Sequence, residues 1–273
     1  MPEGPEVKRF VDQLNHILDN SILTKIKIIS GRYAKHSKPD GWDAFEQLLP
    51  LKIDKINCKG KFIYWTFQNT ESNMWNTLGM TGSWGIHPDH KRVEFSITDS
   101  NGISHSVYFS DIRNFGTLKF SNSKNELTKK LDSIGPDMLS DPPAFNLFKQ
   151  LILNQGSKNL CKAIMDQSVI SGVGNYVKAE SLYLSKISPH RDCSSLSELD
   201  ISNLYKSIRS ILTESYSSGG STLKTYKDLY GNLGSYSGRF LVYGKKNDPA
   251  GNPVMTVETQ DGRTTHWVPL VQV

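Results

Sequence analysis

Residues 1–7, M-P-E-G-P-E-V, open the chain and set both the first element and the chemistry that it can present. Gly4-Pro5 puts a proline into the first turn of a helix, and Glu6 lies near the positive end of that helix. Apolar residues then recur at helical spacing, which predicts a helix that packs along one face. They are Val7, Phe10, Val11, Leu14, Ile17 and Leu18. We therefore expect the first residues to be held in a fixed place.

Removal of Met1 leaves Pro2 as the N-terminus, with a secondary amine beside the carboxyl group of Glu3. A free α-amine has a pKa of about 7.7–8.0, so a sizeable fraction is uncharged at neutral pH. An uncharged amine can attack an aldehyde-like carbon and form an iminium ion, and Glu3 can pass protons to and from the reacting group. The same residues are also typical of a frayed end or a helix cap, so this stretch alone leaves both interpretations open.

The bulk properties narrow the class of protein. The 273 residues suit one large domain or two of modest size, and a net charge of +5 is compatible with nucleic-acid binding without requiring it. Three widely separated cysteines indicate neither a disulfide framework nor a zinc cluster, and the seven histidines show no metal-ligand spacing. No apolar run approaches about 18 residues, and the acidic start argues against a signal peptide. We expect a monomer of a reducing, intracellular compartment, with no membrane partner.

Strand-like runs dominate the first half of the chain. They cover residues 22–29, 51–58, 61–67, 74–78, 93–97, 104–109 and 117–120, and a short helix is expected over 42–49. Asn101-Gly102 between two runs is a strong hairpin signal. Residues 1–125 therefore predict a β-sandwich or barrel with one N-terminal helix.

The second half changes in character. Residues 126–143 are polar and contain prolines, as in a linker, and helices are expected over 144–153, 158–165, 175–184 and 199–215. Residues 239–273 return to strand character, with a turn expected around 247–252. The overall class is α+β, with a helical domain over 144–238 and a C-terminal hairpin over 239–273.

Four separated motifs agree in order with one known family. P-E-G-P-E-V at the start, D-I-R-N-F-G (111–116), M-D-Q-S-V-I-S-G-V-G-N (165–175) and D-G-R-T-T-H-W (261–267) resemble the formamidopyrimidine-DNA glycosylase/endonuclease VIII family. G-N-Y-V-K-A-E (174–180) looks more like its eukaryotic endonuclease VIII-like branch, and a eukaryotic or large-virus origin would suit that. The resemblance spans nearly the whole chain. It implies a β-sandwich, a helix–two-turn–helix domain and a hairpin finger, with DNA in the cleft between the two domains.

The finger departs from the family pattern. Aligned on Val242–Gly244 and Arg263, the positions of the usual zinc cysteines carry Ala250, Pro253, Val268 and Val271. None of these side chains binds zinc. We expect a zincless finger, held by hairpin hydrogen bonds and by packing of Trp267 and Val268, and we expect neither a metal nor a cofactor.

The resemblance assigns catalytic roles to five residues. Pro2 would attack C1′ of the deoxyribose and expel the base, and Glu3 would protonate the sugar ring oxygen. Lys61 would assist and bind the adjacent phosphate, although it also fits an exposed lysine at a strand end. Glu6 would support the site, although electrostatics at the helix N-terminus explains it almost as well. Arg263 would grip phosphates and aid the second elimination, although it also fits a surface arginine on a turn.

A base inside a duplex must be flipped out before it can be reached. The resemblance assigns Met80, Arg113 and Phe115 to the wedge that fills the hole. Taken singly, Met80 and Phe115 are as compatible with a position in the hydrophobic core as with a role in DNA binding. The wedge chemistry is an apolar plug, a guanidinium for the orphaned base and an aromatic ring that stacks for about 1–3 kcal/mol per base.

Phosphate binding is expected at the start of the helix over 175–184. Gly174 and Asn175 would supply close backbone approach and an amide donor, and Lys162 would add a charge. The glycine-rich stretch 219–238 is expected to cover the everted base, with Lys224 and Tyr226 as lesion contacts.

The resemblance implies a bifunctional DNA glycosylase/AP lyase that acts on double-stranded DNA with oxidised bases or abasic sites. Oxidised pyrimidines and ring-opened or over-oxidised purines are expected before intact 8-oxoguanine. A damaged-DNA-binding protein without turnover is the alternative, and it would follow if Met1 stayed in place. An N-terminal-proline tautomerase does not fit the length and leaves the phosphate motifs unexplained.

Overall fold

The structure is a computed structural model that describes residues 2–222 and 226–273, and these fall into two compact units. The N-terminal unit contains Glu6–Asp132 and Gly219–Gly234, together with Pro2. The C-terminal unit contains Ser133–Ser218 and Ser235–Val273, together with Glu3–Pro5. The glycine-rich segment Gly219–Gly234 thus packs with the N-terminal unit, although it follows the helices in the sequence.

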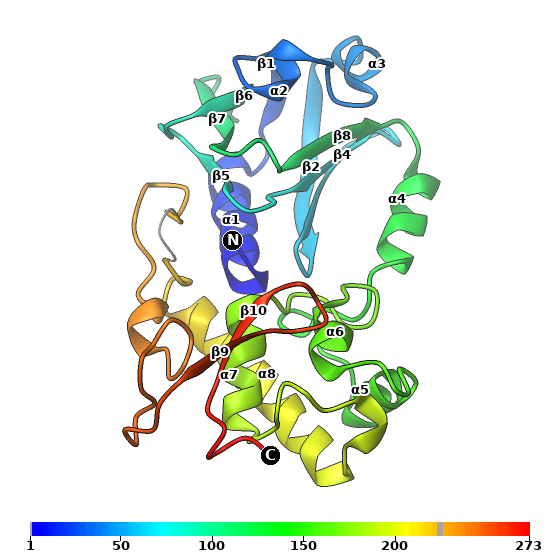
Figure 1. The fold of residues 1–273 in the computed structure, drawn as a ribbon. Coiled ribbons are helices and arrows are strands. Elements are labelled where there is room, and N and C mark those ends of the chain that lie inside the picture. Colours follow the sequence, from blue (N-terminus) through cyan, green and yellow to red (C-terminus); the bar gives the residue numbers. More distant parts are fainter. Residues whose placement is uncertain (1, 223–225) are drawn as a thin grey trace. The chain divides into compact units, whose positions relative to one another are not determined.

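Eight antiparallel strands form the sheet of the N-terminal unit, in the order β5-β7-β6-β1-β2-β3-β4-β8 (Figure 1). Their bounds are β1 Ile22–Ile28, β2 Leu51–Lys59, β3 Phe62–Phe67, β4 Asn73–Thr77, β5 Gly82–Gly85, β6 Lys91–Thr98, β7 Ser104–Asp111 and β8 Thr117–Ser121. The two halves of the sheet join where β1 meets β2, through the pairs Ile22↔Lys52 and Leu23↔Leu51. Such a short junction lets one half fold over the other.

Aromatic side chains from both halves meet in the core. The ring centroids of Trp65 on β3 and Trp84 on β5 lie 5.3 Å apart, and Phe95 on β6 lies 5.7 Å from Trp65. All three side chains are buried. Because β3 belongs to one half and β5 and β6 to the other, the halves face each other as two layers, which confirms the predicted sandwich.

Helix α1 (Gly4–Leu18) buries the predicted apolar stripe, with Phe10 and Leu14 fully inaccessible to solvent. Helices α2 (Arg32–Lys35) and α3 (Trp42–Glu46) follow β1, and the hairpin predicted at Asn101-Gly102 joins β6 to β7. Gly102 has a φ of 78°, which only a residue tolerant of the left-handed region adopts easily.

Three elements of this unit escape the sequence prediction: α2, β5 and a helix that follows β8. Two of the four residues of β5 are glycine, which has little strand propensity. The expected linker begins inside a helix, α4 (Lys124–Asp132), in which Leu127 is the buried residue. The division between the two units falls after Asp132, inside the expected linker, and the helix was missed because so short and polar a segment has almost no apolar period.

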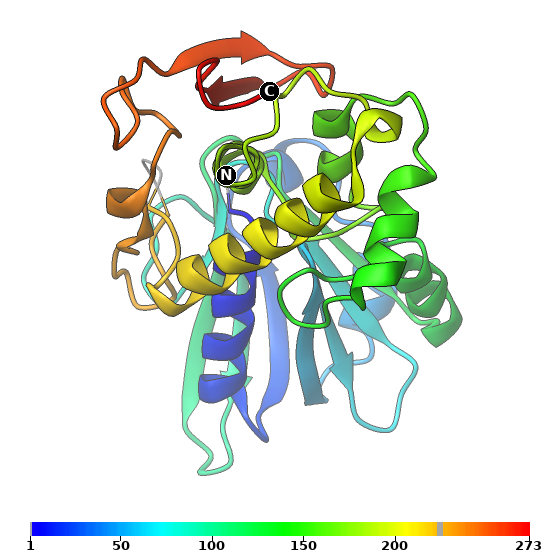
Figure 2. The same cartoon turned by 90° about the horizontal axis from the view of Figure 1, so that it is seen from below.

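The predicted helices of the C-terminal unit are present. They are α5 (Phe145–Leu153), α6 (Leu160–Met165), α7 (Asn175–Leu184) and α8 (Glu198–Ser217). Figure 2 shows α8 as the long yellow helix, which packs against α5 and α7. Ser197 and Asp200 form a capping box at its start.

The finger is an antiparallel pair, β9 (Met255–Glu258) and β10 (Thr264–Trp267), drawn in orange to red in Figure 1. The two strands are joined by residues 259–263, and the turn predicted around 247–252 is present as a separate turn before β9. Gly262, with a φ of 69°, supplies the left-handed residue of the hairpin turn. Asp248 makes a separate turn because its Oδ1 accepts hydrogen bonds from the N–H groups of Ala250 and Asn252. Within the described residues, no helix combines the length and the apolar character that a membrane span needs.

Candidate functional site

The side chain of Glu3 is seated on the N-terminus of α7. Its Oε1 accepts a hydrogen bond from the N–H of Tyr176 at 2.9 Å, and its Oε2 accepts one from the N–H of Val177 at 3.3 Å. Only 1% of Glu3 is exposed, and Pro2 beside it is also buried. Free N–H groups and the helix dipole both favour a carboxylate at this position. The acid that follows Pro2 is therefore held rigidly.

Gly174 leaves the room that this carboxyl group needs. A Cβ at position 174 would lie 2.2 Å from Cδ of Glu3, so any other residue would displace the side chain. The N–H of Gly4 also donates to the carbonyl of Gly172 at 2.9 Å. Gly174 was expected to let a phosphate approach, but in the structure the space beside its Cα is filled by Glu3.

Gln167 of the M-D-Q motif fixes the loop that precedes α7. Its Oε1 accepts from the N–H of Gly172 at 3.1 Å, and its Nε2 donates to the carbonyl of Val173 at 3.0 Å. The glutamine of the motif therefore has a structural role, because its side-chain amide fixes the loop against which Glu3 packs.

Asn175 is the first residue of α7, as predicted. Its Nδ2 donates to the carbonyl of Thr264 on β10 at 3.0 Å, so the amide ties the helix start to the finger. Its Oδ1 is buried and accepts no hydrogen bond from the described residues. Lys162 is exposed on α6, where its ammonium group can reach an anion.

Glu6 binds the glycine-rich segment. Its Oε1 accepts a hydrogen bond from the N–H of Ser221 at 2.7 Å, and a Cβ on Gly220 would lie 3.1 Å from its Cγ. This side chain therefore fixes where Gly219–Gly234 meets α1, within the N-terminal unit.

Of the two expected lesion contacts, Tyr226 lies within the described residues and Lys224 does not. Tyr226 is buried, with its ring edge-on to Phe10 at 5.4 Å, and burial raises the pKa of its hydroxyl. Its ring packs in the core, and its contact with a lesion stays a prediction.

The three wedge residues lie on two loops that pack together. Arg113 donates from Nη1 to the Sδ of Met80 at 3.5 Å, and Phe115 is 58% exposed. A Cβ on Gly79 would lie 2.8 Å from the backbone of Phe115, so glycine permits this close approach. The structure thus brings Met80, Arg113 and Phe115 together at one edge of the sandwich.

Asp111 shapes the loop that carries Arg113 and Phe115. Its carboxylate accepts from the N–H of Gly116 at 2.7 Å, from the N–H of Arg113 at 3.1 Å and from the hydroxyl of Thr81. This role is missed at the level of sequence, although an Asp two residues before a loop residue is a common turn signal.

Lys61 lies in the turn between β2 and β3 and is half-buried. Gly60 before it has a φ of 59°, so the turn requires a residue that adopts the left-handed conformation. The preceding Lys59 donates to the carbonyl of Leu131 at 2.9 Å, which holds the end of β2 against the end of α4.

Arg263 is exposed on the finger turn, and a buried ion pair holds that turn. Nζ of Lys178 on α7 lies 2.6 Å from Oδ2 of Asp261 and 3.3 Å from the hydroxyl of Thr259. The side chain of Lys178 is fully buried and that of Asp261 is 4% exposed. Sequence reasoning missed this pair, because the two residues are 83 positions apart.

Glu180 anchors the entrance to the finger. Its carboxylate accepts hydrogen bonds from three successive N–H groups, those of Leu241 (2.8 Å), Val242 (3.0 Å) and Tyr243 (2.7 Å). Burial raises the pKa of the Glu180 carboxyl, and the three hydrogen bonds act in the opposite direction. The E of G-N-Y-V-K-A-E thus fixes the chain that leads to β9.

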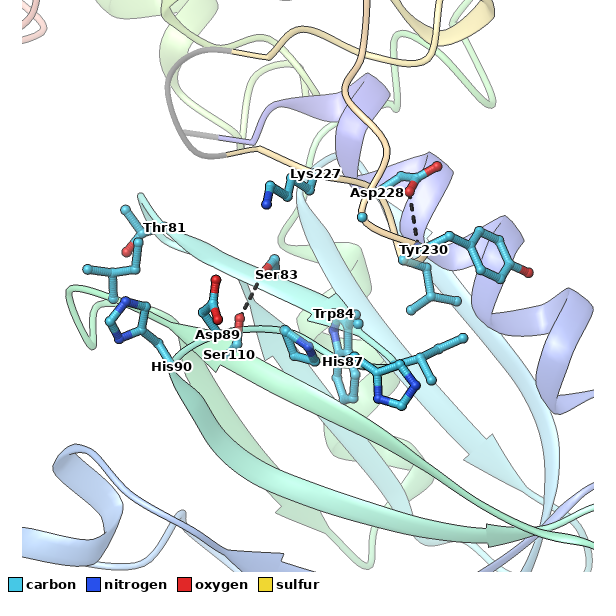
Figure 3. Close-up of a pocket in the computed structure, with 16 residues that line it drawn as sticks. Thr81, Ser83, Trp84, His87, Asp89, His90, Ser110, Lys227, Asp228 and Tyr230 are labelled. Atoms are coloured by element: carbon cyan, nitrogen blue, oxygen red, sulfur yellow. Dashed lines mark hydrogen bonds between the residues drawn. The ribbon is translucent and has the colours of Figure 1, made fainter.

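A cavity of about 500 Å³ opens in the N-terminal unit between β5, the turn after it and the segment Gly219–Gly234 (Figure 3). Lys227 and Tyr230 line one side, and the hydroxyls of Ser83 and Ser110, 2.9 Å apart, line the other. The cavity also reaches Thr81, the residue after Met80, so it borders the wedge loops.

Hydrogen bonds from α1 hold one wall of this cavity. Nε2 of Gln13 donates to Asp228 at 2.9 Å, and Oε1 of Gln13 accepts from the N–H of Leu229 at 3.0 Å. Burial opposes ionisation of Asp228, but hydrogen bonds from Gln13, Asn232 and Tyr230 bring the pKa of its carboxyl below the ordinary value. The wall is therefore preformed.

Among residues 2–222 and 226–273, no group of three or more His, Cys, Asp or Glu side chains is arranged to hold a metal ion. The positions aligned with the family's zinc ligands include Val268, which is fully buried. It packs in an apolar cluster with Ala179 and Val242, and Val271 contacts the same cluster.

Comparison with known proteins gives the same result in three ways. Models of the formamidopyrimidine-DNA glycosylase N-terminal, H2TH and C-terminal domains match residues 1–118, 134–227 and 234–273. The formamidopyrimidine-DNA glycosylase of Listeria innocua is 29% identical over the full length of both chains, and that of Bacillus cereus strain ATCC 14579 is 28% identical over 100% of this chain and 99% of its own.

Solved structures share the fold over nearly the whole chain. The MutM (Fpg) protein of Thermus thermophilus is 27% identical with a TM-score of 0.83, covering 99% of this chain and 98% of its own. Lactococcus lactis Fpg, solved with THF-DNA and an inhibitor, is 24% identical with a TM-score of 0.86, covering 99% of both chains. Three consecutive domain matches, full-length relatives and a shared fold agree with the four motifs, and the chain belongs to the formamidopyrimidine-DNA glycosylase/endonuclease VIII family.

Proposed function

We propose that this chain is a bifunctional DNA glycosylase/AP lyase that removes oxidised bases through a Schiff base on Pro2. One observation carries the proposal: the residue after Pro2 is a buried acid whose carboxylate is seated on the first N–H groups of α7. If Glu3 served only to cap α7, a secondary amine on the preceding residue would have no role. An acid held next to such an amine is suited to proton transfer during attack on a sugar carbon.

Base release and strand scission can proceed with side chains of this chain alone. The neutral amine of Pro2 forms a bond to C1′ while the bond between C1′ and the base breaks, and the base leaves as an anion that takes a proton from solvent. The carboxylate of Glu3 accepts the proton of the attacking amine and passes it to the ring oxygen, the ring opens, and an iminium ion remains on C1′. Loss of the C2′ proton expels the 3′ phosphate by β-elimination, and loss of the C4′ proton then expels the 5′ phosphate by δ-elimination. Lys61 and Arg263 bind the phosphates that leave.

Borohydride trapping tests the covalent step. The protein is incubated with a duplex that contains an oxidised pyrimidine, borohydride is added, and a crosslinked species is sought on a denaturing gel. We expect a crosslink with the natural chain, none with Pro2→Gly, and loss of base release with Glu3→Gln. Normal turnover by both variants would refute the assignment.

The same experiment separates the enzyme from a silent binder on the same scaffold. A binder would shift the duplex in a native gel and give neither crosslink nor strand scission. Mass spectrometry of the purified protein adds the state of Met1, since retained methionine blocks the amine. Full scission by a chain that keeps Met1 would also end the proposal.

We further infer that the finger folds without zinc. The apolar cluster around Val268, the hydrogen bonds to Glu180 and the buried pair of Lys178 and Asp261 together supply the cohesion that a metal provides elsewhere. Val268 and Val271 have no atom that coordinates a metal. Elemental analysis should find no stoichiometric zinc, and one zinc per chain would overturn this inference.

The branch and the lesion class remain proposals. G-N-Y-V-K-A-E supports the endonuclease VIII-like branch by its resemblance to the sequence of that branch. On that basis we propose oxidised pyrimidines and ring-opened or over-oxidised purines as substrates. Single-turnover kinetics on a panel of lesion duplexes tests this, and a clear preference for intact 8-oxoguanine would contradict it.

A further inference from the structure

A second cavity in the N-terminal unit has a different character from the one beside Gly219–Gly234. It measures about 530 Å³ and lies over the outer face of β4 and β8, between α2 and α4. Cationic side chains from three elements line it: Arg32 from α2, Lys119 from β8 and Lys130 from α4. Lys38 and one acid, Asp40, line it as well, so cations outnumber anions among the lining residues. We call this cavity the basic groove. A concave surface that gathers positive charge in this way favours an anionic ligand.

Aromatic rings hold the two ammonium groups in the basic groove. Nζ of Lys119 lies 4.5 Å from the ring centre of Trp75, and Nζ of Lys130 lies 5.6 Å from that of Phe62. Glu126 also lies 3.4 Å from Lys119 at the surface. The rings are covered by the ammonium groups, so they suit the positioning of charge rather than the stacking of bases.

The floor of the groove adds hydroxyl groups. The Oγ1 atoms of Thr77 and Thr117 lie 2.7 Å apart on neighbouring strands and face solvent. Threonine hydroxyls, lysine and arginine are among the side chains that contact phosphate oxygens of DNA. Together they match a run of phosphodiesters better than a single small anion, since the cavity is several times the size of one phosphate.

The groove is continuous with the wedge loops. Arg32 donates from Nη1 to the carbonyl of Asn114 at 3.3 Å, and Asn114 lies between Arg113 and Phe115. Thr117 follows the same loop directly. A nucleic acid engaged by Phe115 would therefore pass into the groove without leaving the N-terminal unit.

We propose that the basic groove binds the phosphodiester backbone of one duplex arm that flanks the lesion. This inference rests on the proposed function and extends it, because it adds a contact beyond the nucleotide that is processed. The groove lies to one side of the wedge loops, so it serves one arm and not the other.

The test uses duplexes that carry a tetrahydrofuran abasic analogue, with arms of about half a helical turn or about two turns, where a turn is roughly 10 base pairs. One arm is lengthened at a time. We expect the natural chain to bind more tightly when one particular arm is long. In Lys119→Gln/Lys130→Gln that advantage should fall by roughly tenfold, and the salt slope on the long duplex should become less steep by about 1.8, which is about 0.9 for each of two phosphates.

The matched control is Lys25→Gln/Lys27→Gln, which removes the same charge from exposed positions on β1 of the same unit. If both double variants lost the same amount of affinity for the long duplex, the effect would be one of general charge and the proposed role of the groove would be refuted. A loss that is the same for short and long arms would also refute it. Thermal unfolding confirms that both variants are folded. If the natural chain cleaves lesion duplexes but ignores arm length, the groove alone fails; if it cleaves none, the proposed function fails.

Discussion

The N–H of Tyr176 donates to Oε1 of Glu3 at 2.9 Å, across 173 positions of sequence. The contact joins the residue that follows Pro2 to the first turn of α7. The contact explains why the motifs combine an acid, a glycine and a helix start. Gly174 leaves room for the Glu3 side chain, and the first N–H groups of α7 bind its carboxylate.

Replacing Gly174 by alanine should remove activity without touching the reactive amine. The new Cβ would lie 2.2 Å from Cδ of Glu3, so the carboxyl group must leave its seat. We expect base release to slow by about 10²–10⁴-fold, the usual worth of a positioned acid or base. Single-turnover kinetics measures this. Gly238→Ala in the same unit is the control, because a Cβ there meets nothing within 4 Å. Unchanged kinetics in Gly174→Ala would show that the position of the Glu3 carboxylate at the start of α7 does not matter for base release.

Replacing Lys178 by methionine should destabilise the finger turn. The change leaves Asp261 as an unpaired buried carboxylate, which costs about 3–5 kcal/mol. The double variant Lys178→Met/Asp261→Leu should recover most of the loss, since no unpaired charge remains. Denaturant unfolding measures both variants. The control is Lys149→Met, whose partner Glu198 is exposed and whose loss should cost less than about 1 kcal/mol. A Lys178 variant as stable as this control would contradict the pair's role.

Replacing Phe115 by alanine should weaken duplex processing with little effect on stability. The ring is 58% exposed, so its loss creates no core cavity. Stacking is worth about 1–3 kcal/mol per base, which predicts a fall in binding to a lesion duplex of roughly 5- to 150-fold. Fluorescence anisotropy with duplex and single-stranded lesion DNA tests this. Leu199→Ala, at 69% exposure on α8, is the control. Equal losses on single strands would argue against a wedge.

Acid should loosen the finger through Asp248. Hydrogen bonds from the side chain of Asn252 lower the pKa of Asp248, with burial opposing and the hydroxyl of Tyr183 also contributing. A lowered folded pKa means that the contribution is complete above the ordinary value of about 3.9 and is lost as pH falls below it. Asp248→Asn should therefore melt a few degrees lower at neutral pH. That difference should shrink as the pH drops below about 4, and a constant difference would exclude Asp248 as the cause.

The elements were largely predictable because their signals are local. The apolar stripe of α1, the strand runs and the start of α7 at Asn175 each depend on residues close in sequence. The turn around 247–252 was predicted, but the turn that joins the paired strands was not, because Asp248 and Gly262 both carry strong turn signals and nothing local says which one lies between the strands.

The contacts that build the site were not predictable in the same way. Glu3 with Tyr176, and Lys178 with Asp261, are far apart in sequence and depend on tertiary packing. The packing of Tyr226 on Phe10 is a further contact of this kind, because no local signal places that ring in the core. Motif identity located the residues, and only the structure shows what each one touches.

An apolar cluster in place of a thiolate cage changes how the finger meets oxidants. Residues 239–273 contain no cysteine, and burial raises the pKa of Cys161 to about 12 and that of Cys193 to about 11, so almost no thiolate exists at either position. Peroxide reacts with thiolates far faster than with thiols. The finger should thus keep its shape under the same oxidative stress that damages DNA bases, and chelators should leave it untouched.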